Sequence, residues 1–498
     1  MSENGEHGRG PAPTMAAMLL DPHSCYQALQ AHDARFDGRF FVGVSSTRIY
    51  CRPVCTVKVP KRENCRFFPS AAAAESSGYR PCLRCRPELA PGNASIDASA
   101  RLAQAAASLI EDGMLNETGI DALATRLDVT DRHLRRVFQT EFGVSPVEFA
   151  QTHRLLLAKR LLTDTSLPVT EVALASGFGS LRRFNTLLRE RYRLSPTDLR
   201  KAADGGRSTD VLVFTLGYRP PLDWNALLSF LGTRAIEGVE HVESGLYART
   251  VRLVQAGKTH AGWVAVTPAK RKAALEVTIA ASLAKAIPPV LARMKRLFDL
   301  SCDPSEIAAA LGSLAEERPG LRLPGAVDGF ELAVRAILGQ QITVRAARTL
   351  AGRFASRFGD AIDAPLPALR TLFPSADRIA ALEVSDIAEL GVIAARARAI
   401  LALARAIAAG ELRLEAGADV ESTLERLRNL PGIGEWTAQY VAMRALSWPD
   451  AFPHTDYGVL KAIGEQNPRK VLAHAAQWQP WRAYAVMHLW KSLETSKP

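Results

Sequence analysis

Four cysteines have the spacing of a metal site. They form two close pairs, Cys51 with Cys55 and Cys82 with Cys85, and 26 residues separate the pairs. Two pairs at this separation can surround one tetrahedral ion, and four thiolate ligands favour Zn²⁺. The sequence therefore predicts one zinc ion in a four-cysteine site, and no motif in it points to an organic cofactor.

The chain around these cysteines is strongly basic. A thiolate-rich metal site in basic surroundings leads to the hypothesis that one cysteine does chemistry on a phosphate-bearing polymer. The alternative is a zinc site that only holds a small domain together. The basic residues between positions 48 and 86 are Arg48, Arg52, Lys58, Lys61, Arg62, Arg66, Arg80, Arg84 and Arg86.

Length and composition are typical of a globular protein with several domains. The 498 residues are enough for about three or four domains, and a net charge of +11 favours a polyanionic partner, nucleic acid first. Few cysteines and their metal-like spacing favour a reducing cytoplasm, and the absence of a run of about 18 uncharged apolar residues argues against a membrane span. The three remaining cysteines, expected to be small buried apolar residues, are Cys25, Cys65 and Cys302.

Changes of composition divide the chain into five parts. Gly, Pro and Glu are frequent at the start, so we expect a disordered tail over residues 1–19. Linker-like sequences lie at 88–98 and 202–208, and a further break lies near 319–324. The four predicted blocks are 20–88, 98–201, 209–300 and 301–498.

The second block contains an internal repeat. Ser145-Pro146 and Ser195-Pro196 are 50 residues apart, and an amphipathic helical pattern precedes each of them. Each pattern follows a short helix and a tight turn, which is the order of a helix-turn-helix unit. The duplication favours two DNA-recognition helices on one chain over a helical bundle with solvated arginines. The candidate DNA-binding arginines are Arg132, Arg135, Arg136, Arg182 and Arg183.

The last two blocks differ in their periodicity. Block three has strand-like runs and one helix, which predicts a mixed α+β domain. Its strand-like runs are 211–216, 261–266 and 274–279, and its helix is 224–234. Block four is almost entirely helical by its pattern, with periodicity through 328–358, 391–409 and 421–445.

A glycine-containing turn in block four is a candidate phosphate-binding element. Gly432 and Gly434 separate two helical segments, and the second helix begins with free N–H groups. A plain helix–helix turn is the alternative. The second helix carries Trp436 and Tyr440 on one face, and Asp456 follows at a loop-to-helix junction. Asp456 is a candidate catalytic carboxylate or only a helix cap.

Three stretches resemble known families. Residues 23–88, with the cysteine pairs and their gap, resemble the zinc-binding methyl-acceptor domain of Ada-type regulators. Block two resembles the paired helix-turn-helix module of AraC-type regulators, and blocks three and four resemble AlkA-type 3-methyladenine DNA glycosylases. The motifs that carry the glycosylase resemblance are Pro221-Leu222-Asp223-Trp224, Leu321-Arg322-Leu323-Pro324-Gly325, Val334-Arg335-Ala336-Ile337-Leu338-Gly339-Gln340, Leu430-Pro431-Gly432-Ile433-Gly434-Glu435-Trp436-Thr437-Ala438 and Trp481-Arg482-Ala483-Tyr484-Ala485.

The resemblance implies a multidomain and mostly α fold. It consists of a small zinc-binding α+β domain, two helix-turn-helix units, an α+β (TBP-like) domain and an all-α helix-hairpin-helix glycosylase domain. For the first half, the resemblance implies that Cys51 accepts a methyl group from a methylphosphotriester in DNA, while Cys55, Cys82 and Cys85 complete the zinc site. Methylation then activates sequence-specific DNA binding.

For the second half, the resemblance implies hydrolysis of the N-glycosidic bond of alkylated purines, 3-methyladenine and 7-methylguanine. Asp456 matches the catalytic aspartate, and Trp436, Tyr440 and Trp490 match aromatic residues that line the base site. Gln341 stands where the family has a leucine that wedges into the DNA. Trp436 replaces the lysine of relatives that cut the strand, so we expect base removal only.

The leading hypothesis is a DNA glycosylase that also senses methylation and regulates transcription. One alternative is a zinc-containing transcription factor whose C-terminal half only binds DNA. The other is a glycosylase with a degenerate regulatory half. The expected partners are damaged and promoter double-stranded DNA and RNA polymerase, and we expect a cytoplasmic monomer with no membrane partner.

Overall fold

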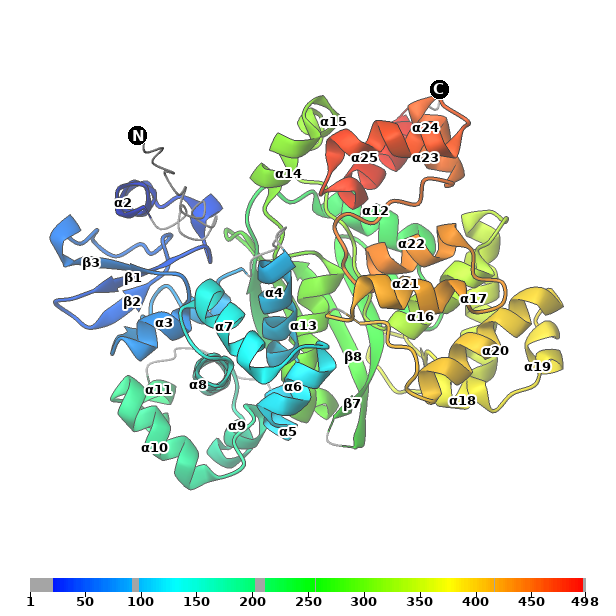
Figure 1. Cartoon of the computed structure of the whole chain (residues 1–498). Coiled ribbons are helices and arrows are strands. Elements are labelled where there is room, and N and C mark those ends of the chain that lie inside the picture. Colours follow the sequence, from blue (N-terminus) through cyan, green and yellow to red (C-terminus); the bar gives the residue numbers. More distant parts are fainter. Residues whose placement is uncertain (1–20, 92–97, 202–210, 256, 416, 496–498) are drawn as a thin grey trace, which may run out of the picture.

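The computed structural model of the chain describes residues 21–91, 98–201, 211–255, 257–415 and 417–495. The predicted tail over 1–19 lies outside the described residues. In Figure 1 the blue N-terminal part and the cyan helices lie on one side of the green central sheet, and the yellow to red helices lie on the other side. None of the described helices is long and apolar enough to cross a membrane.

The N-terminal part is a small four-stranded sheet with short helices beside it. Its strand order is β3-β1-β2-β4, in which β1 is antiparallel to β2 and β3, and β4 is parallel to β2. The side chain of Asp21 accepts the N–H of Ser24, so the first helix begins at a strong N-terminal cap. The elements are α2 (Pro22–Gln30), β1 (Phe41–Val44), β2 (Ile49–Cys51), β3 (Cys65–Phe68), α3 (Ala71–Ser76) and β4 (Arg80–Pro81).

Residues 98–201 are helical and contain the predicted duplication. Ser145 and Glu148 form a capping box at the start of α8, and Ser195 and Asp198 exchange the equivalent bonds at α11. Both Ser-Pro dipeptides therefore mark helix starts that directly follow a second helix of the repeat. The helices are α4 (Ala98–Glu111), α5 (Met114–Glu117), α6 (Ile120–Arg126), α7 (Asp131–Phe142), α8 (Pro146–Asp164), α9 (Val169–Ala175), α10 (Leu181–Tyr192) and α11 (Pro196–Lys201).

The third block is a five-stranded antiparallel sheet covered by two helices, α12 (Trp224–Arg234) and α13 (Ile287–Leu297). The strand order is β5-β9-β8-β7-β6, so the first strand pairs with the last. The three predicted strands and the helix are confirmed, while β6 and β7 were not predicted. The strands are β5 (Val211–Gly217), β6 (Glu240–Glu243), β7 (Leu246–Gln255), β8 (Lys258–Pro268) and β9 (Ala274–Ala280).

The last block is helical except for a two-stranded ribbon, β10 (Asp360–Ala361) with β11 (Thr371–Leu372). One continuous hydrophobic core fills it, from Ile307 in its first helix to Leu489 in its last. The helices are α14 (Pro304–Leu311), α15 (Ser313–Glu316), α16 (Gly329–Leu338), α17 (Val344–Phe358), α18 (Ala376–Ala380), α19 (Val384–Ala388), α20 (Ala394–Ala408), α21 (Val420–Arg428), α22 (Glu435–Arg444), α23 (Tyr457–Ile463), α24 (Pro468–His474) and α25 (Arg482–Thr495).

Three hydrophobic cores cross the boundaries between the predicted blocks, and the core of the last block does so by including Ala226, Ile236 and Val239 of the third block. One core joins Tyr50 of the first sheet to Phe138 of α7, and another joins Leu188 of α10 to Val277 of β9. The start of the predicted linker 88–98 is also part of the fold, because Pro87–Leu89 is a short 3-10 helix. Residues 92–97 of that linker lie outside the described residues, as does the second predicted linker, 202–208, and residue 98 already begins α4. The N-terminal blocks are therefore held by shared cores rather than strung on free linkers.

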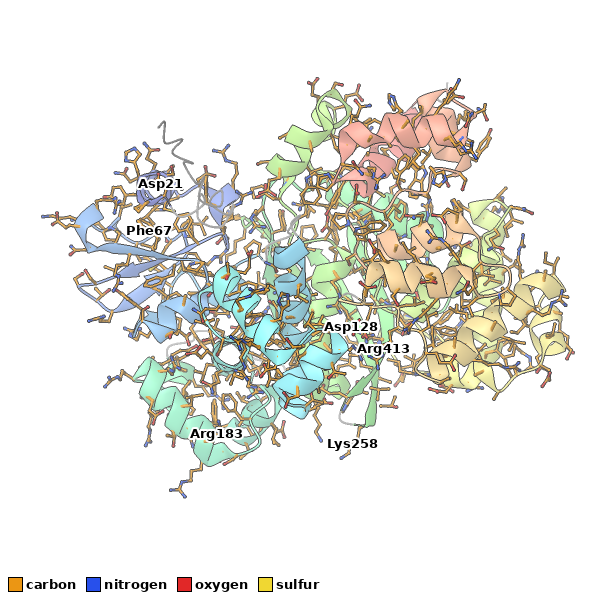
Figure 2. All side chains as sticks on the ribbon, viewed as in Figure 1. Asp21, Phe67, Asp128, Arg183, Lys258 and Arg413 are labelled. Carbon is orange, nitrogen blue, oxygen red and sulfur yellow. The ribbon has the colours of Figure 1, made fainter. Side chains whose placement is uncertain are left out.

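Ion pairs join the N-terminal blocks to the C-terminal ones. Lys295 of α13 pairs with Glu111 at 3.3 Å, and Arg296 pairs with Asp112 at 3.0 Å, both at the end of α4. Arg126 at the end of α6 contacts Glu415. Figure 2 shows this region of the molecule from the same side, with Asp128 and Arg413 labelled.

A second set of pairs lies at α14, where Arg39 of the zinc-binding block contacts Asp303 and Glu306. Asp303 also approaches Arg219 of the third block, with an N–O distance of 3.8 Å. Asp303 and Arg219 are buried, so solvent screens these charges less than it screens surface pairs.

Candidate active site and metal centre

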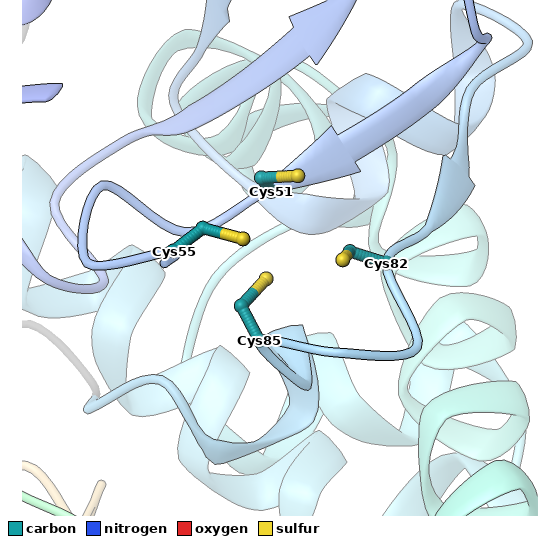
Figure 3. A group of neighbouring side chains, drawn as sticks. All are labelled: Cys51, Cys55, Cys82 and Cys85. Carbon is teal, nitrogen blue, oxygen red and sulfur yellow. The ribbon is translucent and has the colours of Figure 1, made fainter. Parts of the chain in front are cut away.

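The four predicted cysteines converge on one point (Figure 3). Their sulfur atoms all lie within 4.8 Å of one another. Cys51 ends β2, and Cys82 follows β4, which lies parallel to β2 in the same sheet. Four sulfur ligands at this separation fit one tetrahedral Zn²⁺ and suit the harder divalent ions poorly. The residues therefore form a site for one zinc ion, as predicted.

The four sulfurs differ in the N–H groups that face them. Cys85 Sγ accepts the backbone N–H of Arg52 at 3.4 Å, and Cys82 Sγ accepts that of Arg84 at 3.4 Å. Cys55 receives the backbone N–H of Val57. The described contacts give Cys51 no such donor. A hydrogen bond draws electron density from a thiolate, so in a zinc-bound site the three sulfurs that accept one would be the weaker nucleophiles.

The three cysteines outside the cluster are buried, as expected. Burial raises the pKa of the Cys25 thiol to about 12. It also raises the pKa of the Cys65 and Cys302 thiols above the usual value. These three residues are therefore unreactive thiols at neutral pH.

Asp456 is the N-cap of α23, and its carboxylate receives three N–H donors. Oδ1 accepts the backbone N–H of Val459 at 3.0 Å and Nε1–H of Trp490 at 2.8 Å. Oδ2 accepts Nε1–H of Trp436 at 2.8 Å. The capping and candidate catalytic roles, which the sequence left as alternatives, are thus compatible. Three donors from three elements fix the orientation of the carboxylate.

The two indoles that bind this carboxylate belong to a group of four aromatic side chains, which we call the aromatic cluster. Trp436 and Tyr440 stack with ring centroids 5.4 Å apart and an interplanar angle of 11°. Trp490 lies 6.3 Å from Tyr440, and Phe230 stacks on Trp490 at 6.3 Å. The three predicted aromatic residues therefore come together, while Phe230 was not predicted. It comes from α12 of the preceding block, and nothing in its local sequence points to the site.

Arg444 lies behind the aromatic cluster and was not predicted either. Its guanidinium donates to the hydroxyl of Tyr440 at 2.8 Å and to the carbonyl of Gly325 at 3.0 Å, and it lies 5.0 Å from the ring of Phe230. Burial alone would raise the pKa of the Tyr440 phenol, but Arg444 and Arg234 outweigh burial, so that pKa lies below its usual value. The hydrogen bond from Arg444 to the hydroxyl of Tyr440 fixes the ring of Tyr440 in the cluster.

The predicted phosphate-binding turn lies next to this site. Gly432 has φ of 79°, and a Cβ there would stand 3.1 Å from the side chain of Ala399, so only glycine suits this position. Gly434 is the N-cap of α22 and is exposed with free space around it. Gln340 Nε2 donates to the carbonyl of Gly432 at 2.9 Å and so holds the turn. The neighbouring Gln341 is exposed with φ of 55°.

The five predicted arginines lie on the second helices of the two helix-turn-helix units and are exposed. Leu134 and Phe138 bury the opposite face of α7, and Phe184 and Leu188 bury that of α10. Figure 2 shows Arg183 at the outer edge of α10, away from the rest of the molecule. The arginines on α7 are Arg132, Arg135 and Arg136, and those on α10 are Arg182 and Arg183.

Related proteins match almost the whole of this chain. A protein of Mycobacterium tuberculosis (strain H37Rv), named "Probable bifunctional transcriptional activator/DNA repair enzyme AlkA", is 38% identical over 489 residues, which cover 95% of this chain and 97% of the relative. This chain belongs to the family of AlkA-type bifunctional transcriptional activator/DNA repair enzymes. The resemblances drawn from the sequence motifs are therefore confirmed.

Four family models match consecutive parts of this AlkA-type chain. They are the metal binding domain of Ada (24–88), a helix-turn-helix domain (123–202), the AlkA N-terminal domain (213–328) and the HhH-GPD superfamily base excision DNA repair protein (334–473).

Two further relatives each match one end of this chain. DNA-3-methyladenine glycosylase 2 of Escherichia coli is 38% identical over 278 residues, 56% of this chain and 96% of that protein. The bifunctional transcriptional activator/DNA repair enzyme AdaA of Bacillus subtilis is 29% identical over 188 residues, 37% of this chain and 85% of that protein.

Proposed function

We propose that the C-terminal part of this AlkA-type chain is a monofunctional DNA glycosylase that removes alkylated purines, among them 3-methyladenine and 7-methylguanine. The observation that carries the proposal is the carboxylate of Asp456, fixed by the indole N–H groups of two members of the aromatic cluster. A matching relative from Escherichia coli is named as a 3-methyladenine glycosylase.

Hydrolysis of the glycosidic bond needs little more than the carboxylate of Asp456 and the aromatic cluster. Alkylation at N3 or N7 gives the purine a positive charge, so the base is already an activated leaving group and a strong general acid is unnecessary. The rings of Trp436, Tyr440 and Trp490 attract the cationic base, each contact contributing roughly 0.5–2 kcal/mol. Asp456 stabilises the positive charge that develops on the sugar as the glycosidic bond breaks, and orients the attacking water.

The damaged base must leave the helix to reach Asp456. In this proposal the turn at Gly432 and Gly434 binds the DNA backbone, and the exposed Gln341 fills the gap that the base leaves. Residue 436 is a tryptophan and not a lysine, so this position offers no amine that could form a Schiff base with the sugar.

The test measures base release and strand integrity together. The purified chain is incubated with duplex DNA treated with a methylating agent, and free methylated purines are separated by chromatography. We expect 3-methyladenine and 7-methylguanine to be released, with strands that break only after alkali. Strand breaks without alkali would contradict the monofunctional assignment, and no release would contradict the glycosylase assignment.

For the N-terminal part, we propose that Cys51 accepts a methyl group from a methylphosphotriester in DNA. A zinc ion held by the four cysteines would keep their thiols deprotonated, so a nucleophile would exist at neutral pH without a base. The Cys51 sulfur forms a bond to the methyl carbon while the bond from that carbon to the phosphate oxygen breaks. The electron pair leaves with the oxygen and restores a phosphodiester anion, and no proton moves.

The lack of an N–H donor to Cys51 among the described contacts supports this choice of sulfur. The product is a thioether, so each molecule reacts once. The loss of one thiolate charge also lowers the repulsion between this site and DNA phosphate. In this proposal, methylated protein then binds its promoter through Arg132, Arg135 and Arg136 of α7, and Arg182 and Arg183 of α10.

The acceptor is identified by incubating the chain with a short duplex that contains one methylphosphotriester. Peptide mass spectrometry then locates the added methyl group. We expect it on the peptide that contains Cys51, and a Cys51→Ser variant should take up none. Methyl on Cys85 instead, which is more exposed to solvent than Cys51, would contradict the assignment. Cys65→Ser is the matched control and should react like the parent.

We propose that the chain is a monomer that contacts RNA polymerase at its promoter. We also propose functional units at 20–88, 98–201, 209–300 and 301–498. The molar mass in solution, from light scattering with and without DNA, tests the monomer.

A further inference from the structure

A buried carboxylate, Glu75, joins the zinc-binding block to the second helix-turn-helix unit and to α8, the helix that follows the first unit. It lies on α3 and is 3% exposed. Oε1 accepts the hydroxyl of Tyr50 at 2.9 Å and that of Tyr192 at 3.0 Å, and Oε2 accepts the hydroxyl of Thr152 at 3.0 Å. The three donors come from β2, α10 and α8.

The positions of these donors connect the proposed methyl acceptor to the recognition helices. Tyr50 directly precedes Cys51 in β2, and Tyr192 is the last residue of α10. Thr152 lies on α8, which follows the first helix-turn-helix unit. The start of the same helix, α3, also contacts α7, because Ser70 donates its hydroxyl to the carbonyl of Phe142 at 2.7 Å. The helix α3 therefore connects the acceptor strand to both recognition helices.

A carboxylate is a costly choice for this position. Burial raises the pKa of Glu75 to about 7, against the opposing effect of its three hydroxyl donors. The surroundings are otherwise apolar, since Ala72, Ala73 and Ala74 beside it belong to the shared hydrophobic core. Packing alone would be served by an apolar side chain, whereas a carboxylate fixes three groups in defined directions.

We propose that Glu75 is a positioning residue that holds the acceptor site and the recognition helices in one fixed arrangement, so that methylation of Cys51 raises the DNA affinity of the whole regulatory part. This inference rests on the proposed acceptor role of Cys51. Two DNA-binding surfaces on one rigid body add their binding free energies, whereas loosely linked surfaces lose part of the gain. The removal of repulsion at the zinc site therefore reaches the promoter complex only while Glu75 maintains the geometry.

The first test measures the gain in DNA affinity on methylation. The probe is a duplex selected from random-sequence DNA by the methylated parent chain, and the gain is the ratio of the unmethylated Kd to the methylated Kd. We expect Glu75→Gln and Tyr192→Phe to lower this ratio at least about fivefold, since each removes or weakens hydrogen bonds at the buried side chain of residue 75. Methyl uptake on Cys51 should stay within about twofold of the parent.

The matched control is Tyr79→Phe, a buried tyrosine of the same block whose described contacts do not include Glu75. It should keep the parent's ratio. A Glu75→Gln protein that takes up methyl and keeps the full ratio overturns the inference. If Glu75→Gln does not fold, Tyr192→Phe and Thr152→Val decide in its place.

A second measurement needs no methyl transfer. It distinguishes a failure of the positioning role of Glu75 from a failure of the acceptor role of Cys51. Hydrogen exchange of unmethylated protein should be faster at the end of α10, residues 189–192, in Glu75→Gln than in the parent. Equal exchange rates there overturn the positioning role, even if Cys51 is methylated normally. If the parent takes up no methyl while exchange changes as expected, the proposed acceptor function fails and the positioning role stands.

Discussion

Replacement of Asp456 by asparagine isolates the charge of the carboxylate, because the side chain keeps its size. The carbonyl oxygen of the new amide can still accept the backbone N–H of Val459 and Nε1–H of Trp490, which now face Oδ1. The amide nitrogen would face Nε1–H of Trp436, and two donors cannot bond to each other. The variant therefore loses one hydrogen bond and the negative charge.

The two losses have different sizes and different readouts. One unsatisfied donor in a half-buried site costs about 1 kcal/mol of folding free energy, so the variant should remain folded. A unit charge about 4 Å from the developing positive charge contributes about 4 kcal/mol at an effective dielectric constant of about 20. The amide dipole replaces a part of this, so we expect a loss of about 100- to 1,000-fold in the rate of base release.

The assay is single-turnover release of 3-methyladenine from methylated duplex DNA, with enzyme in excess. Asp450→Asn is the matched control, because Asp450 pairs with Arg482 at 2.7 Å and has no described contact with the aromatic cluster. It should release base at the parent's rate. A rate for Asp456→Asn within about tenfold of the parent would refute the view that charge at this position drives the reaction.

Three further outcomes follow from buried groups. Removal of zinc by a chelator should abolish methyl uptake and change base release by less than about twofold, because the four cysteines belong to one hydrophobic cluster and Tyr440, Trp490 and Phe230 of the aromatic cluster to another. Burial lowers the pKa of His488 to about 4. Its neutral form stabilises the fold above a pH of about 6.5, and this stability is lost as the pH falls towards about 4, by up to about 3 kcal/mol. His488→Gln should flatten that dependence in urea unfolding followed by tryptophan fluorescence, which reports only residues 224–490, where all seven tryptophans lie. Glu88→Gln should destabilise the chain by about 3–5 kcal/mol, because it leaves the buried Lys159 without a negatively charged partner. Lys159→Met in the same protein should restore most of the loss in denaturant unfolding, since Arg86, the other cation at Glu88, also pairs with Asp164.

Local signals in the sequence predicted much of the site. The cysteine spacing, the repeated Ser-Pro dipeptides and the one-turn spacing of Trp436 and Tyr440 each act within a short stretch, so a single pattern was enough. The strand β7 was missed because it is buried on both faces and carries arginines. Arg249 is buried there and pairs with Glu331 at 2.5 Å, so its charge is neutralised by a residue that the local sequence does not contain.

Contacts between distant segments were not predictable either, because the partner of each residue lies outside its local sequence. Phe230 reaches the aromatic cluster from another block, and Glu75 collects its donors from three separate elements. Each of these residues alone has an ordinary sequence environment: Phe230 completes an apolar helix face, and Glu75 ends a run of alanines. Only the fold brings the partners within hydrogen-bond or stacking distance.

The shared cores also decide how the two activities can be separated. The sequence suggests a cut near residue 208, but Leu161 and Leu188 from the helix-turn-helix part belong to the same core as Phe214 and Val277 of the sheet. A truncation there would expose apolar surface on both fragments, at about 25 cal/mol for each Å². Loss of activity in a fragment would then report the lost core and not a lost site. Single substitutions at Cys51 and Asp456 in the full chain leave that core intact, so they separate the two functions where truncation cannot.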